Sequence, residues 1–179
     1  MSQKIAGAKI PRNQSAFMMY ISDQISRGYS MKINGTISAE KAENFAARIE
    51  QKFSVNLTSP QRIARKKKGI PNFILIMFPS PGEQYVWFVL AAGLPNKIES
   101  LAAQHRETFT DATKKESRIQ FKDYELKRST KSRKNGGGIK WTWFIKKKEA
   151  KMLQEELIAG ARGRSIHKLE QAATRLRNR

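Results

Sequence analysis

Apolar residues recur at helical spacing in several stretches of the chain. The clearest stripe follows Ser38, a favourable N-cap residue, and predicts a helix that ends at about residue 53. The same spacing predicts helices over residues 15–27 and 95–113, and two C-terminal helices over 147–159 and 165–179 that are separated by glycines. The residues of the clearest stripe are Ala42, Phe45, Ala46, Ile49 and Phe53.

Two apolar runs, residues 72–78 and 84–92, are short, rich in β-branched and aromatic residues, and joined by a segment with two prolines and a glycine. They predict a hairpin. Because both faces of each run are apolar, the hairpin is expected either at the centre of a sheet that is covered on both sides or with one face available to a partner. Residues 29–37 predict a strand or a second hairpin, since the turn dipeptide Asn34-Gly35 lies in their middle.

Another hairpin is predicted from residues 118–128 and 139–145, with a long, basic and glycine-rich tip between them. The alternation of the first of these runs slips near Asp123, as a β-bulge would make it do. Residues 59–71, which carry many positive charges and end in Gly69 and Pro71, are interpreted as a connecting loop.

Hairpins dominate this order of elements, so the sheet should be mostly antiparallel and covered by helices. The sequence therefore predicts an α+β fold with a C-terminal helical extension. We expect a flexible arm over residues 1–14, an α+β domain over 15–148 and the helical extension over 149–179.

The charge balance is the strongest functional signal in the chain. Its 179 residues contain 35 Lys and Arg but 15 Asp and Glu, a formal net charge of +20 at pH 7. A polyanion would relieve such self-repulsion, so nucleic acid, either DNA or RNA, is the first expected partner and an anionic membrane surface the second. The apolar stripes of the C-terminal helices lack Trp and Phe and include glutamates, which favours a protein partner or self-association through residues 149–179 over a membrane.

Several classes of chemistry find no support in the residues. Cysteine is absent and there are two histidines, so a metal site would need mostly carboxylates, which are sparse. No phosphate-binding loop follows Gly136-Gly137-Gly138, and there is no nucleophile elbow. We expect no metal, no cofactor and no catalytic residues. No apolar run approaches the roughly 20 residues needed to span a bilayer. With no secretory signal at the N-terminus, we expect a cytoplasmic protein.

Three basic clusters are the candidate contacts to phosphates, for which Lys and Arg are the usual ligands. The first lies in the predicted loop, the second at the predicted hairpin tip and the third at the base of that hairpin. Any one cluster alone is also compatible with a solvated surface, but together they agree with the overall excess of charge. Their residues are Arg62, Arg65, Lys66, Lys67 and Lys68; Lys127, Arg128, Lys131, Arg133 and Lys134; and Lys146 and Lys147.

Aromatic residues refine this picture. Trp141 and Trp143 fall on one face of a predicted strand, and Tyr85 and Trp87 share a face of another. Each pair is suited to stacking unpaired bases, but the hydrophobic core is the commoner place for large aromatic side chains. We keep Trp141 and Trp143 as candidate nucleic-acid contacts beside the basic tip.

The sequence thus predicts a nucleic-acid-binding protein, an accessory component of a nucleoprotein complex, rather than an enzyme. Its small size and basic composition are typical of accessory proteins of mobile elements, although no motif of a particular family is present. One alternative is a metal-dependent nuclease or replication enzyme of a mobile element, with Asp123 and Glu125 on one strand face holding the ion. Another is a scaffold subunit that docks a protein through its C-terminal helices.

Overall fold

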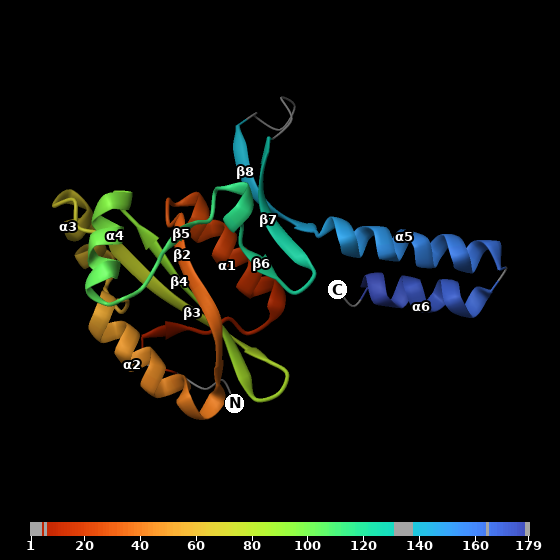
Figure 1. Ribbon diagram of the computed structural model, residues 1–179, viewed down its shortest axis with the longest axis horizontal. Helices are drawn as coiled ribbons and strands as arrows, with labels where there is room; N and C mark the ends of the chain where they lie inside the picture. The colour runs from red at the N-terminus through yellow and green to blue at the C-terminus, as the bar shows by residue number, and fades with distance from the viewer. Residues whose placement is uncertain (1–4, 6, 131–137, 164, 178–179) are drawn as a thin grey trace. The chain divides into compact units, whose positions relative to one another are not determined.

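The computed structural model describes the chain except for residues 1–4, 6, 131–137, 164 and 178–179. It divides into two compact units. The first comprises Met1–Arg118 and Lys127–Thr142, and the second comprises Ile119–Leu126 and Trp143–Arg179. Most helices and strands of both units are labelled in Figure 1. Helices and a largely antiparallel set of strands are both well represented, which confirms the predicted α+β class.

The first unit is built on a five-stranded sheet with the order β1-β3-β4-β2-β5. The predicted central hairpin is confirmed, with β3 (Asn72–Ser80) and β4 (Gln84–Ala92) paired antiparallel in the middle. β2 (Met31–Ser38) pairs antiparallel with β4, and β5 (Thr110–Asp111) pairs antiparallel with β2. The outer strand β1 (Ala8–Lys9) pairs parallel with β3, which makes the sheet mixed.

Helices cover both faces of this sheet, as its two-sided apolar strands require. On one face lies α1 (Gln14–Ser26), whose Phe17 ring is 5.0 Å from that of Phe78 and 6.0 Å from that of Phe88. On the other face lie α2 (Ala42–Phe53) and α4 (Pro95–Gln104). There the rings of Phe53 and Phe73 are 4.9 Å apart in the main hydrophobic cluster.

Residues 29–37 do not form a hairpin. β2 runs straight through Asn34-Gly35, and Gly35 lies opposite Trp87 on β4. A Cβ atom at residue 35 would stand 2.9 Å from the Trp87 ring. The glycine is therefore used for close packing of an indole across the strand pair rather than for a turn.

The N-terminal segment, expected to be a flexible arm over residues 1–14, contains the two residues of β1. Ile5 is also buried in the main hydrophobic cluster. This part of the segment is therefore paired with the sheet through its backbone and packed through a side chain.

The predicted helix over 95–113 is too long. α4 ends at Gln104, Arg106 has a φ of 55°, and the chain then enters β5. A left-handed residue ends a helix because it turns the backbone out of the helical path. Two short 3-10 turns, η1 (Ala39–Lys41) before α2 and η2 (Lys115–Ser117) after β5, complete the connections.

The second sheet has the order β6-β7-β8, with β6 (Gln120–Phe121), β7 (Tyr124–Thr130) and β8 (Ile139–Ile145). The predicted bulge near Asp123 is wrong, because Phe121 pairs with Tyr124 across a tight turn in which Lys122 has a φ of 49°. The slip in alternation therefore marks a hairpin turn and a change of strand.

The C-terminal helices are α5 (Lys147–Arg162) and α6 (Ile166–Arg177), which pack side by side in Figure 1. Gly160 does not interrupt α5, contrary to the sequence-based expectation. It is buried inside the helix, and a Cβ at this position would lie 3.1 Å from the Leu169 side chain. Its role is to let α6 approach closely. Among the helices of the described residues, none is long and apolar enough to cross a membrane.

Candidate nucleic-acid interface

The first basic cluster lies on a helix, not on the predicted loop. α3 (Ser59–Lys67) begins after Thr58, whose backbone N–H donates to the Gln61 side chain at 2.8 Å, as in a capping box. Pro60 in the first turn is also typical of a helix start. The helix contains few apolar residues, so no apolar stripe drew attention to it, and its clearest sequence signal lay in these capping residues.

Arg62 fastens α3 to the rest of the first unit. Its guanidinium donates to the carbonyl oxygens of Val55, Leu57 and Phe73 at 2.7, 3.0 and 2.8 Å, and to the Tyr29 hydroxyl at 3.2 Å. These four bonds use most of the five donors of an arginine. Arg62, one of the predicted phosphate contacts, is therefore committed mainly to internal hydrogen bonds.

Arg65 is half-buried, and its Nε has no hydrogen-bond partner among the described residues. Burial, with a smaller effect from the nearby charge of Arg62, lowers the pKa of the Arg65 guanidinium. A buried cation of this kind is stabilised when an anion or another acceptor approaches it.

Lys66, Lys67 and Lys68 are the exposed members of the cluster, at the C-terminal end of α3. Within the part of the chain that the structure describes, none of these three ammonium groups forms an ion pair with a carboxylate. Each therefore presents up to three N–H donors and a full charge to solvent. Positive charge at this end of a helix also interacts favourably with the helix dipole.

The structure describes some of the other predicted phosphate contacts. In β7, Lys127 is half-buried and Arg128 is exposed, while Lys131, Arg133 and Lys134 lie outside the described residues. Lys147 is exposed at the start of α5. The backbone N–H of Lys146 donates to the carbonyl oxygen of Asp123 at 2.8 Å, which ties the end of β8 to the β6–β7 turn, and the Lys146 side chain is half-buried.

The tryptophans divide between two environments. Trp141 and Trp143 both lie on β8 and are half-buried, Trp141 in the first unit and Trp143 in the second. Trp87 instead packs against Phe45, with ring centroids 4.7 Å apart, and Tyr85 is buried in the main hydrophobic cluster. The Tyr85 and Trp87 pair is thus part of the core, not a stacking platform.

The acidic pair of the nuclease alternative does not have the geometry that this alternative assumed. Asp123 lies in the turn between β6 and β7, whereas Glu125 lies in β7 opposite Gln120. The two carboxylates therefore do not share a strand face. A search of the described residues finds no group of three or more His, Cys, Asp or Glu side chains that could hold a metal ion.

The C-terminal helices expose several large aliphatic side chains, of which Ile166 is 73% accessible. Met152 and Ile158 on α5 are also exposed. These residues are compatible with the protein-docking role expected for residues 149–179, which remains a prediction.

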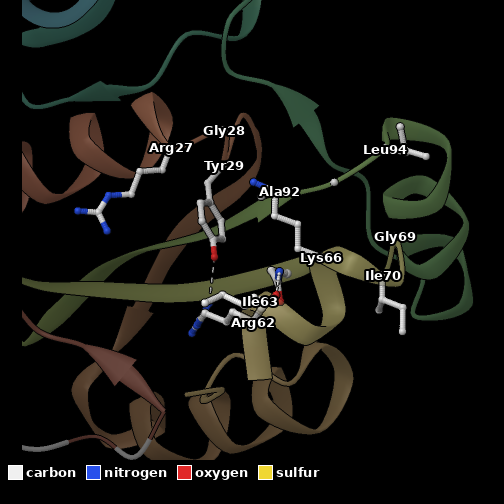
Figure 2. Close-up of a pocket in the computed structure, with 12 residues that line it drawn as sticks. Arg27, Gly28, Tyr29, Arg62, Ile63, Lys66, Gly69, Ile70, Ala92 and Leu94 are labelled. Carbon is white, nitrogen blue, oxygen red and sulfur yellow. Dashed lines mark hydrogen bonds between the residues drawn. The ribbon is translucent and has the colours of Figure 1, made fainter. Parts of the chain in front are cut away.

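A cavity of about 430 Å³ lies beside α3, entirely within the first unit, and it was not foreseen from the sequence. Figure 2 shows Tyr29 pointing toward Arg62 on one side of the cavity, with Ile63 and Lys66 from α3 and Ile70 and Leu94 farther along. The lining residues come from three separate parts of the chain, within residues 27–29, 62–72 and 92–94. Because they are far apart in the sequence, residue spacing could not show that they line one cavity. A sequence signal for the cavity was Ile63, an aliphatic residue within a basic run.

Asn72, which also lines this cavity, is only 6% exposed. Its Nδ2 donates to the Arg62 carbonyl oxygen at 3.0 Å, while its Oδ1 is buried and has no partner among the described residues. The cavity therefore combines an apolar wall, exposed positive charge and a buried acceptor. No protein-family model, curated protein or solved structure matches this chain, so the assignment of the site depends on this geometry.

Proposed function

We propose that the protein binds nucleic acid and that the exposed lysines of α3 contact phosphates of the bound strand. The observation that carries the proposal is the group of Lys66, Lys67 and Lys68, which are adjacent, solvent-exposed and without carboxylate partners in the described parts of the chain. The net charge of +20 supports it, because association with a polyanion would release counterions and relieve self-repulsion.

The attachment of α3 strengthens the proposal. A cluster of lysines on a free loop would lose conformational entropy when it bound a strand. Here the four hydrogen bonds of Arg62, one of them to Phe73 in β3, hold the helix against the rest of the first unit, so the backbone that carries the lysines is already ordered. Arg128, Lys147 and the hairpin-tip cations outside the described residues remain further proposed contacts.

Fluorescence anisotropy with labelled single- and double-stranded DNA and RNA, titrated at several salt concentrations, tests the proposal. The triple variant Lys66→Gln, Lys67→Gln, Lys68→Gln should bind with a smaller slope of log K against log salt, by up to about 2.7 on duplex DNA. Lys41→Gln, Arg48→Gln, Lys114→Gln is the matched control, because these residues are exposed, carry the same total charge and lie outside the cluster.

The control variant should keep nearly the slope of the wild-type protein. Equal loss of slope in the two triple variants would mean that total charge, not α3, governs binding. No binding of any of the four nucleic acids by the wild-type protein near physiological salt would contradict the proposed function.

A further inference from the structure

The cavity beside α3 has an unusually apolar wall for a basic surface. Ile63, Ile70 and Leu94 line it and are 57%, 42% and 56% exposed. Its volume of about 430 Å³ lies in the range of about 300–1,000 Å³ that small-molecule sites occupy. Three exposed aliphatic side chains around one cavity are a surface that a flat apolar group would cover.

Two polar groups of fixed orientation lie on the same cavity. The Asn72 amide is oriented by its bond to the Arg62 carbonyl, so its buried Oδ1 is left as an acceptor without a partner. The Tyr29 hydroxyl accepts a hydrogen bond from Arg62, so its own proton remains available to a ligand. The cavity thus offers one donor positioned by Arg62, and the buried Asn72 Oδ1 becomes a second partner only when the side chains that cover it move aside.

A positively charged side chain also lines the cavity. Lys66 lines it and is exposed, and it is one helical turn after Arg62. In Figure 2 the side chain of Lys66 extends into the space beside Tyr29. Arg27 also lines the cavity, but its Nε is 3.0 Å from the Asp23 carboxylate, so Lys66 is the better placed to receive an anionic group.

We infer that this cavity binds one unpaired nucleotide. This inference rests on the proposed function, since the nucleotide would be part of the strand whose phosphates the α3 lysines contact. The base packs against the aliphatic wall, the Tyr29 hydroxyl donates to a ring or carbonyl acceptor on its pairing edge, and the phosphate contacts Lys66. An N–H on the same edge donates to Asn72 Oδ1 after the side chains that cover this oxygen have moved aside. Only an unpaired base has that edge free.

The polar pair favours a nucleotide over an anionic lipid. An acyl chain would fill the apolar wall and place its head group near Lys66, but it would leave Asn72 Oδ1 buried and unpartnered. A lipid would therefore gain no hydrogen bond at Asn72, whereas every nucleobase carries at least one N–H donor on its pairing edge that could form one.

The test uses nucleoside 5′-monophosphates and the full-length protein. Titration of ¹⁵N-labelled protein with AMP, GMP, CMP and UMP should shift the amide resonances of cavity residues such as Tyr29, Ile63 and Asn72. Leu94→Asp, which places a carboxylate in the wall at an exposed position, should weaken nucleotide binding at least about tenfold. Met19→Asp is the matched control, because Met19 is 71% exposed and lies on α1 outside the cavity.

The outcomes separate this inference from the proposed function. If labelled oligonucleotides bind but the monophosphates shift none of the cavity resonances, the nucleotide site is wrong and the phosphate interface stands. If monophosphates bind in the cavity while oligonucleotides do not bind, the site is supported and the proposed function is wrong. Decanoate binding there more tightly than every nucleotide would overturn the inference in favour of a lipid site.

Discussion

Replacement of Arg62 by Met should destabilise the first unit by about 3 kcal/mol. The change removes three bonds to backbone carbonyls and one to the Tyr29 hydroxyl. Hydrogen bonds from a charged donor contribute about 1.5–3 kcal/mol each, so four of them set an upper range of about 6–12 kcal/mol. Arg62 is only half-buried, so in the variant water can bond to some of the oxygen atoms that Arg62 leaves. The expected loss of stability is therefore closer to the contribution of one or two hydrogen bonds.

Urea denaturation followed by circular dichroism and by tryptophan fluorescence measures this loss. With a slope of about 2 kcal/mol/M, a loss of 3 kcal/mol lowers the midpoint by about 1.5 M. Lys66→Met, an exposed change one turn later on the same helix, is the control and should stay within about 0.5 kcal/mol of the wild type. A loss below about 1 kcal/mol in Arg62→Met would refute the conclusion that Arg62 fastens α3 to the rest of the first unit.

Three further predictions follow from packing and burial. Gly35→Ala should destabilise the protein by about 1–3 kcal/mol in urea denaturation, because its Cβ would stand 2.9 Å from the Trp87 ring; an unchanged midpoint would contradict this packing. Gly160→Val should increase hydrogen exchange in α6 by pushing Leu169 away, and unaltered exchange would show that α6 does not depend on this contact. Burial lowers the pKa of Lys32, so the folded state disfavours its charge. Lys32→Met should therefore raise stability at pH 7, by an amount that shrinks as the pH approaches 10.5, and a gain independent of pH would exclude this cause.

The pattern of apolar residues was sufficient to predict most of the fold. The two-sided apolar runs of β3 and β4 predicted central strands whose two faces are covered, by helices or by a partner, and the stripe of α2 predicted one of the helices that cover them. The predictions that the structure contradicts failed for local physical reasons. At Gly35 a turn dipeptide was outweighed by packing against the indole of Trp87, which lies far away in the sequence. The helix α3 was overlooked because it contains few apolar residues, and its capping residues mark its start.

From the sequence, the candidate interface could be predicted only from the number and position of its positive charges. Composition predicts a polyanionic partner and a basic run predicts where it would bind, but neither tells a phosphate contact from an internal hydrogen-bond donor. Arg62 and Lys66 belong to the same run, yet one bonds to three backbone carbonyls and the other is exposed. The acceptor of Asn72 and the hydroxyl of Tyr29 carry no charge, and it is the folding of α3 onto β3 that places them on one cavity.

This division of roles within one helix leads to a final prediction that charge alone would not make. Arg62→Lys keeps the charge of α3, so the salt slope for an oligonucleotide should not change. An ammonium cannot reproduce the forked bonds of the guanidinium, so Tyr29 should lose its fixed orientation and nucleoside monophosphates should bind more weakly. Lys67→Gln should do the reverse, because Lys67 is exposed and does not line the cavity: the slope falls by about 0.9 on duplex DNA and nucleotide affinity stays the same. If both variants changed the same quantity, anchoring and phosphate contact would not be separable on α3, and total charge would be the better account of how this protein binds.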